Sequence, residues 1–195
     1  MSGYPPQGHQ GYGAQGGYQQ GYPGGQGGNQ LVVQWFHAVD ADRSGQINAI
    51  ELQQALVNGN MSRFSEEACR VMIDQFDANK SGTIDVNEFG QLFNYINQWK
   101  GVFQGFDKDR SGSIDLGEFS QALQQMGYRF SQTFVQNILK KYDPRTGKLA
   151  LDNFIVVSFQ LKRLTDSFKK RDREMRGQAV IGYEDFVGLA LGAHQ

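Results

Sequence analysis

Three stretches of this 195-residue chain repeat one pattern of side chains, and the repeat constrains the fold more than any other feature. They cover residues 40–51, 77–88 and 107–118 and read DADRSGQINAIE, DANKSGTIDVNE and DKDRSGSIDLGE. Each places oxygen-bearing side chains at positions 1, 3 and 5, glycine at position 6, isoleucine at position 8 and glutamate at position 12. One such match is typical of a polar surface turn, but three matches in register indicate a repeated structural unit.

The donors in these stretches are hard oxygen atoms, and Ca²⁺ takes six to eight such ligands at about 2.3–2.6 Å. Glycine at position 6 permits the positive φ that the sharp bend requires, and glutamate at position 12 closes the shell with both carboxylate oxygens. Position 7 contributes a main-chain carbonyl, and Asn48 at position 9 holds a bridging water. The predicted ligands are Asp40, Asp42, Ser44, Gln46, Glu51, Asp77, Asn79, Ser81, Thr83, Asp85, Glu88, Asp107, Asp109, Ser111, Ser113, Asp115 and Glu118.

The acidic ligands of the three loops predict an order of calcium affinity, because ligand charge tunes the strength of binding. The third loop has four acidic ligands and the first has three, whereas the second replaces an acid with Asn79 at position 3 and regains one at Asp85. We therefore expect the third loop to bind calcium most tightly and the second loop to bind it most weakly.

Helices are predicted on both sides of the loops, so the expected fold class is all-α. Residues 88–106 carry apolar side chains at helical spacing without a proline, which predicts one helix that leaves the second loop and enters the third. The isoleucines at position 8, Ile47, Ile84 and Ile114, predict very short β pairing between neighbouring loops. Residues 153–170 predict a second shared helix, with an expected buried stripe formed by Phe154, Val157, Leu161, Leu164 and Phe168.

Two further copies of the pattern follow, at residues 143–153 and 172–183, and both have lost ligands. The first copy is one residue short and has Asn153 where the closing glutamate belongs. The second has Arg176 at position 5, where it would direct a cation at the ion, and Tyr183 at position 12. We expect both copies to be structural units that bind no calcium.

The odd number of units has a consequence for assembly. A helix–loop–helix unit buries its apolar face best against a second unit, so two intramolecular pairs are expected to leave the fifth unit unpaired. A second chain would then cover its exposed apolar patch in a homo- or heterodimer; alternatively, the segment folds back on its own domain. The apolar residues of this unit are Val180, Ile181, Phe186, Val187, Leu189 and Leu191.

Five tandem units, the last two degenerate, resemble the penta-EF-hand family over residues 31–195. Segments such as QWFHAVDADRSG, FDKDRSGSID and YEDFV carry the resemblance. It implies a calcium-regulated cytosolic adaptor that binds target peptides and whose fifth EF-hand forms a heterodimer with the apoptosis-linked member of the family. It also implies recruitment to endoplasmic-reticulum exit sites and vesicle membranes, a role in COPII-coated ER-to-Golgi transport, and a role as a ubiquitin-ligase co-adaptor.

The composition of the chain predicts a disordered leader and a cytoplasmic protein. Residues 1–30 contain 11 glycines and 7 glutamines but no charged side chain, so they lack the apolar surface needed to offset the entropy of ordering. A formal net charge of −1 argues against nucleic acid as a partner. The single cysteine, Cys69, excludes an internal disulfide and suits a reducing compartment. No apolar run is long enough for a membrane span, so any membrane contact is expected to be peripheral.

No arrangement of side chains suggests an enzyme. His9, His37 and His194 are scattered along the chain, and the clustered carboxylates are expected to bind calcium. Two functions stay open: a sensor exposes an apolar groove when calcium binds, whereas a buffer barely changes shape. The aromatic residues Tyr95 and Trp99 on the first shared helix favour the sensor, and calcium-dependent membrane association is a further alternative.

Overall fold

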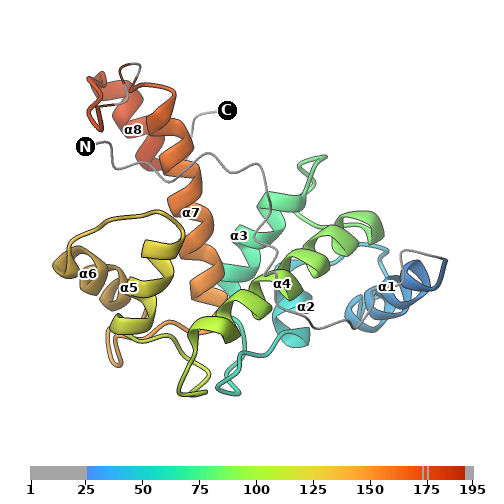
Figure 1. The fold of residues 1–195 in the computed structure, drawn as a ribbon. Coiled ribbons are helices and arrows are strands. Elements are labelled where there is room, and N and C mark those ends of the chain that lie inside the picture. The colour runs from blue at the N-terminus through green and yellow to red at the C-terminus, as the bar shows by residue number, and fades with distance from the viewer. Residues whose placement is uncertain (1–25, 173, 175, 192–195) are drawn as a thin grey trace.

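The expected all-α fold of five tandem helix–loop–helix units is confirmed. The computed structural model describes residues 26–172, 174 and 176–191. Figure 1 shows α1 to α4 on one side of the molecule, α5 and α6 on the other, and α7 running from the centre to α8. The eight helices of the described residues are α1 (Gln26–Val39), α2 (Ala49–Ala55), α3 (Glu66–Phe76), α4 (Val86–Phe106), α5 (Leu116–Gln125), α6 (Gln132–Tyr142), α7 (Leu151–Lys169) and α8 (Tyr183–Leu191).

Three helices begin where a predicted calcium loop ends, and a loop side chain caps each of them. Asn48, Asp85 and Asp115 at loop position 9 are the N-caps of α2, α4 and α5, and their side chains accept hydrogen bonds from N–H groups of the first turn. The closing glutamate three residues later accepts the N–H of the cap residue, which completes a capping box at each helix. The loop sequence therefore also fixes where the exit helix starts.

Helix α4 joins the second loop to the third without a break, as the sequence predicts. It lies at the centre of the fold and packs against α1, α3, α5 and α7. Phe89, Leu92, Ile96 and Phe103 are buried along it. Because four helices contact α4, a change in its position would reach most of the core.

Helix α7 is also continuous, but only its first half is buried. Phe154 and Val157 lie in the core as expected, whereas Leu164 is 44% exposed, so the predicted buried stripe is wrong at that position. No side chain between residues 159 and 169 is fully buried. The reason is that α7 leaves the core after packing on α3 and α4 and extends toward α8 (Figure 1).

The loops pair through isolated β-bridges, which confirms the expected short β pairing. Ile47 and Ile84 exchange N–H···O bonds of 2.9 and 3.0 Å. Ile114 pairs in the same way with Leu149 of the fourth unit, at 2.7 and 2.9 Å. All four side chains are fully buried. The first unit is thus paired with the second and the third with the fourth, and no such bridge involves the described residues of the fifth unit.

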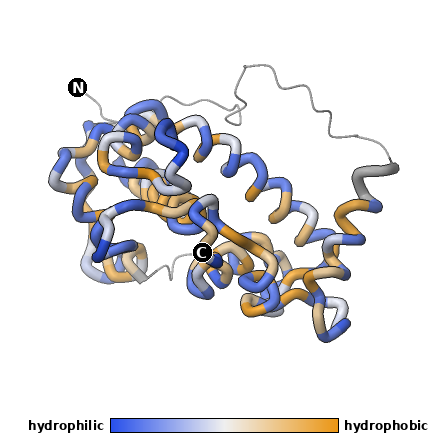
Figure 2. Tube along the Cα trace, turned by 90° about the horizontal axis from the view of Figure 1, so that it is seen from below, coloured by the Kyte–Doolittle hydropathy of each residue, from blue (hydrophilic) through white to orange (hydrophobic). Residues whose placement is uncertain are grey.

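The paired units share one hydrophobic core. Figure 2 shows hydrophobic and hydrophilic residues alternating along the helices, as expected for amphipathic helices that pack on one face. Cys69 on α3 lies in this core, and burial raises the pKa of its thiol to about 12. Cys69 therefore behaves as a small apolar residue.

The N-terminal boundary differs slightly from the expected one. Helix α1 begins at Gln26, before the domain boundary predicted at residue 31. Disorder was predicted for residues 1–30, but residues 26–30 are helical, and residues 1–25 lie outside the described residues. Among the helices of residues 26–191 that are described, none is both long and apolar enough to cross a membrane.

Candidate calcium sites

The first loop brings three carboxylates together between α1 and α2. Carboxylate oxygens of Asp40, Asp42 and Glu51 all lie within 4.8 Å of one another. The two oxygens of Asp40 accept hydrogen bonds from the N–H groups of Ser44 and Gly45, each at 3.0 Å. Gly45 has a φ of 78°, in the left-handed region that glycine adopts without strain. The loop is thus folded so that its carboxylates converge.

The third loop has the same arrangement. Carboxylate oxygens of Asp107, Asp109 and Glu118 also lie within 4.8 Å of one another, and Asp107 is buried. The N–H of Gly112 donates to Oδ2 of Asp107 at 3.0 Å. The N–H of Ser111 donates to Asp109 at 2.9 Å and holds the pKa of that carboxyl below its usual value. An ionised carboxylate is the form that binds a cation.

The second loop keeps the hydrogen bonds but lacks a cluster of three acids. Asn79 occupies position 3, and its Oδ1 accepts the N–H of Ser81 at 2.9 Å. Asp77 accepts the N–H groups of Ser81 and Gly82 at 3.0 and 2.7 Å, as the first aspartate does in the other two loops. The backbone is therefore folded for a cation, with a neutral oxygen in place of one carboxylate.

The closing glutamates are held at both carboxylate oxygens. In each loop, Oε1 accepts the N–H of position 2 and Oε2 accepts the N–H of position 9. An oxygen that accepts one N–H keeps a second lone pair for an ion, and Oε1 of Glu51 accepts a further, longer bond from the Asp42 N–H at 3.4 Å. The bonds run from Ala41 and Asn48 to Glu51 (3.0 and 3.0 Å), from Ala78 and Asp85 to Glu88 (3.0 and 2.9 Å), and from Lys108 and Asp115 to Glu118 (2.8 and 3.0 Å).

The serines at position 5 lie beside the carbonyl groups at position 7, and both were predicted as ligands. Ser44, Ser81 and Ser111 donate to the carbonyl oxygens of Gln46, Thr83 and Ser113 at 2.9, 3.2 and 2.9 Å. At position 9, Oδ1 of Asp85 and of Asp115 accepts N–H groups of the helix that each residue caps. These two aspartates act at least partly as helix caps.

A contact between the first two loops could not be predicted from either loop alone. The Thr83 hydroxyl donates to Oε1 of Gln46 at 2.9 Å, so the two position-7 residues join their side chains. Each of the two residues directly precedes the isoleucine of the β-bridge. Their equal position in the two loops is the sequence signal that would have suggested the contact. The bond connects a ligand segment of one loop to that of the other.

The two degenerate loops keep their turns but use their acids differently. The Asp143 carboxylate accepts N–H groups from Arg145 and Thr146 within its own turn. Asp172 accepts the N–H of Gly177 at 2.6 Å, and Arg176 forms an ion pair with Glu174 at 3.1 Å. In the described residues of these loops, no three acidic side chains come together within 4.8 Å.

Comparison with known proteins agrees with this geometry. The model of the EF-hand domain pair matches residues 31–93, and that of the EF-hand domain matches residues 98–127. Human sorcin is 39% identical over 193 residues, which cover 92% of this chain and 96% of sorcin. The chain belongs to the penta-EF-hand family. This confirms the resemblance found in the sequence, and the protein binds Ca²⁺ through its EF-hand domains.

Peflin sequences are more similar to this penta-EF-hand protein than sorcin is. Peflin from Danio rerio is 47% identical over 84% of this chain, and human peflin is 45% identical over 80%. The chain covers only 61% and 55% of these two relatives, less than two thirds of their length. The solved structure of a homolog of programmed cell death 6 protein from Leishmania major Friedlin superposes with a TM-score of 0.72 at 31% identity, covering 85% of this chain and 95% of that one.

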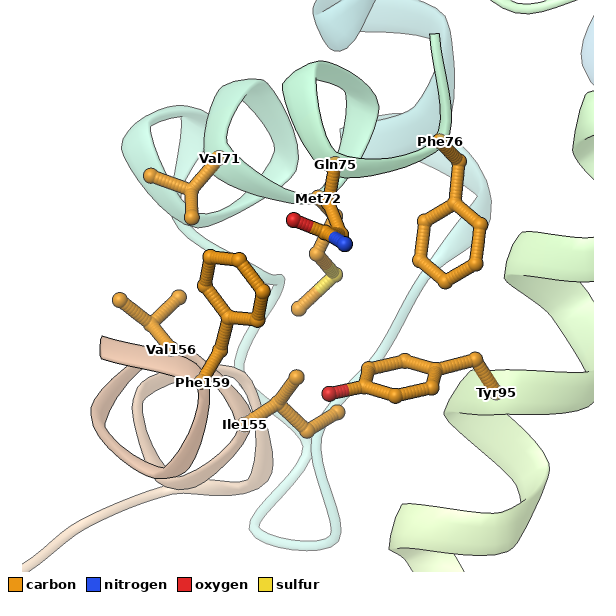
Figure 3. Close-up of a pocket in the computed structure, with 8 residues that line it drawn as sticks. All are labelled: Val71, Met72, Gln75, Phe76, Tyr95, Ile155, Val156 and Phe159. Carbon is orange, nitrogen blue, oxygen red and sulfur yellow. The ribbon is translucent and has the colours of Figure 1, made fainter. Parts of the chain in front are cut away.

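The penta-EF-hand domain also has an apolar pocket between α3, α4 and α7, away from the calcium loops. Its cavity volume is about 10 Å³, roughly the room that one water molecule needs. Figure 3 shows the Met72 side chain pointing into it and the Tyr95 hydroxyl directed toward Ile155. The pocket thus lies between α4, which connects two calcium loops, α3, which leads into the second loop, and α7. Its lining residues are Val71, Met72, Gln75, Phe76, Tyr95, Ile155, Val156 and Phe159.

Proposed function

We propose that this penta-EF-hand protein is a calcium sensor and adaptor that dimerises through its fifth hand and binds target peptides in a calcium-dependent manner. The strongest support is the apolar surface of the fifth hand. Val180, Tyr183 and Phe186 are 104%, 84% and 59% exposed. Helix α8 packs extensively against no other helix of the described residues. The remaining apolar side chains described there are partly exposed: Ile181, Val187 and Leu189.

A single substitution in this surface tests the dimer. Phe186→Asp is expected to weaken dimerisation at least about tenfold, because an unpaired carboxylate would be buried at the interface. Light scattering coupled to size-exclusion chromatography at micromolar concentration measures the change, for the chain alone and mixed with the apoptosis-linked family member. Phe134→Asp on α6 is the matched control, since Phe134 is 45% exposed but lies outside the fifth hand. Equal masses for the unaltered chain and Phe186→Asp under both conditions would contradict the proposal.

Aromatic contacts around α4 support a sensor rather than a buffer. The Tyr95 ring lies 5.2 Å from the Phe76 ring on α3, and the Trp99 ring lies 5.7 Å from the Phe154 ring on α7. Helix α4 starts in the second loop and ends in the third, so calcium at either end can shift these contacts. Such a shift would open or close the apolar pocket that the three helices share.

Tryptophan fluorescence distinguishes the two functions. With Trp35→Phe in place, calcium is expected to shift the emission of Trp99 and to raise the binding of an apolar dye about twofold or more. Trp35 is removed because it is 51% exposed and lies on α1 against Phe93, outside the pocket. Unchanged emission and unchanged dye binding at saturating calcium would indicate a buffer.

The family resemblance supports a more specific version of the proposal. In that version the partner is the apoptosis-linked member, and the heterodimer acts at endoplasmic-reticulum exit sites in vesicle-coat regulation and as a ubiquitin-ligase co-adaptor. Co-purification from calcium-loaded and chelated lysates tests the partner, and microscopy of the tagged chain with and without Phe186→Asp tests recruitment. Binding of the purified chain to anionic vesicles in calcium would instead support direct association with membranes.

A further inference from the structure

Helix α7 begins without a cap of its own. The N-caps of α2, α4 and α5 use a side chain at loop position 9, but the equivalent residue of the fourth hand is Ala150, which makes no side-chain cap. Asn58, far away in sequence, supplies the missing acceptor: the Asp152 N–H in the first turn donates to its Oδ1 at 3.0 Å. Buried N–H groups of a first helical turn need such a partner, and Asn58 and Asp152 are both only 3% exposed.

Asp152 provides a cap in return. The N–H of Ser65, the N-cap of α3, donates to Oδ2 of Asp152 at 2.8 Å. In a capping box, the acceptor of the N-cap N–H is a Glu or Gln side chain three residues later in the same helix. Helix α3 has Ala68 at that position, which offers no such acceptor. We call Asn58, Ser65 and Asp152 a crossed cap. Asn58, which precedes α3, accepts an N–H of the first turn of α7, and Asp152 of α7 accepts the N–H of Ser65, the N-cap of α3.

The crossed cap holds a small hairpin between the first two hands. A β-bridge between Val57 and Arg63 closes it, and the Asn58 N–H donates to the Ser62 carbonyl at 2.7 Å. The Asn58 amide group also donates to the Ser62 hydroxyl at 3.0 Å and to the Arg63 carbonyl at 3.3 Å. Asn58 thus fixes the hairpin internally while it caps α7.

The tip of this hairpin packs closely against the third calcium loop. A Cβ atom built on Gly112 would lie 2.4 Å from the Asn60 nitrogen and 2.5 Å from the Gly59 carbonyl carbon. A Cβ atom at the same position of the other two intact loops, on Gly45 or Gly82, would meet nothing within 4 Å. Among the three intact loops, only the third is supported at position 6 by another segment of the chain.

We propose that Asn58 and Asp152 are positioning residues for the third calcium site, although neither is a ligand. The crossed cap seats the hairpin against Gly112 in the conformation where Asp107, Asp109 and Glu118 converge. The fourth hand, which has lost its own ligands, thereby contributes to calcium binding by its neighbour. Coupling between two sites is reciprocal, so an ion in the third loop also stabilises the hairpin.

Calorimetry on the full chain tests the effect on affinity. In a background with both Glu51→Gln and Glu88→Gln, the third loop alone among the three intact loops keeps its closing glutamate, so the titration reports on that loop. Adding Asp152→Ala or Asn58→Ala is expected to weaken calcium binding by about tenfold, a typical size for coupling between sites. Asp166→Ala is the matched control, because Asp166 lies on the same helix and is exposed in an ion pair with Lys162. A dissociation constant within twofold of the background would overturn the proposal.

Hydrogen exchange tests the reverse effect without altering the crossed cap. Calcium is expected to slow exchange of the hairpin and cap amides Asn58, Met61, Ser62 and Ser65. Glu118→Gln should remove this protection, whereas Glu88→Gln should keep it. Protection that is insensitive to calcium, or that survives Glu118→Gln, would overturn the proposal. Neither experiment depends on dimerisation, so a monomeric chain would leave the inference intact.

Discussion

Glutamine in place of Glu118 is expected to weaken calcium binding at the third loop on the order of 100-fold, about 2 to 3 kcal/mol. The substitution keeps the size of the side chain and one oxygen acceptor for the capping bonds. It removes the negative charge and one of the two oxygens that close the shell. Because Glu118 clusters with Asp107 and Asp109, the tightest step of a calcium titration should disappear.

Glu88→Gln is the matched substitution in the second loop, where the weakest step is expected. It should leave the tightest step in place, since Asn79 already lowers the charge of that loop. Isothermal titration of both variants, in the same buffer, compares the two sites directly. If the tightest step survived in Glu118→Gln and vanished in Glu88→Gln, the order of affinity predicted from carboxylate number would be wrong.

Gly112→Ala is expected to destabilise the fold more than any other glycine substitution in the calcium loops. Gly112 has a φ of 74°, and a left-handed conformation costs a residue with a Cβ about 1–2 kcal/mol. The added Cβ atom would also overlap the hairpin backbone at Gly59 and Asn60, and such overpacking adds about 1–3 kcal/mol. A total of about 2–5 kcal/mol lowers the melting temperature by roughly 4–20 °C in a domain of this size.

Gly82→Ala separates the two contributions to this effect. Gly82 occupies the same loop position and has a φ of 81°, but a Cβ atom there meets nothing within 4 Å. Its free energy of unfolding should fall only by the share due to backbone strain, about 1–2 kcal/mol. Its melting temperature should therefore fall less than that of Gly112→Ala. Calorimetric scans of both variants, with calcium and with a chelator, provide the measurement. Equal melting temperatures would show that the hairpin does not press on the third loop.

The loops and helices were predictable because their signals are local. Twelve consecutive residues specify the donors, the bend at Gly45 and the cap at Asn48, so a loop can be recognised without knowing its surroundings. The run of residues 88–106, which has no break, likewise predicts one shared helix, and the observed helix is Val86–Phe106. Burial was predicted less well at Leu164, because helical spacing indicates which face is apolar but not how far along the helix the core extends.

Contacts between distant segments could not be predicted in this way. The crossed cap joins Asn58 and Ser65 to Asp152, and each residue alone is an ordinary turn or cap residue. The missing cap at Ala150 is visible in the sequence, but its replacement depends on how the hands pack together. The bond from Thr83 to Gln46 also depends on the alignment of two loops, which the β-bridge between Ile47 and Ile84 provides.

Helix α4 is continuous, so it forms a direct structural link between the second and third calcium loops. At about 1.5 Å per residue, its 21 residues hold the second and third loops roughly 30 Å apart. No break in the helix separates Val86 from its last residues. If calcium moved either end of α4, the helix would carry that movement to the loop at its other end.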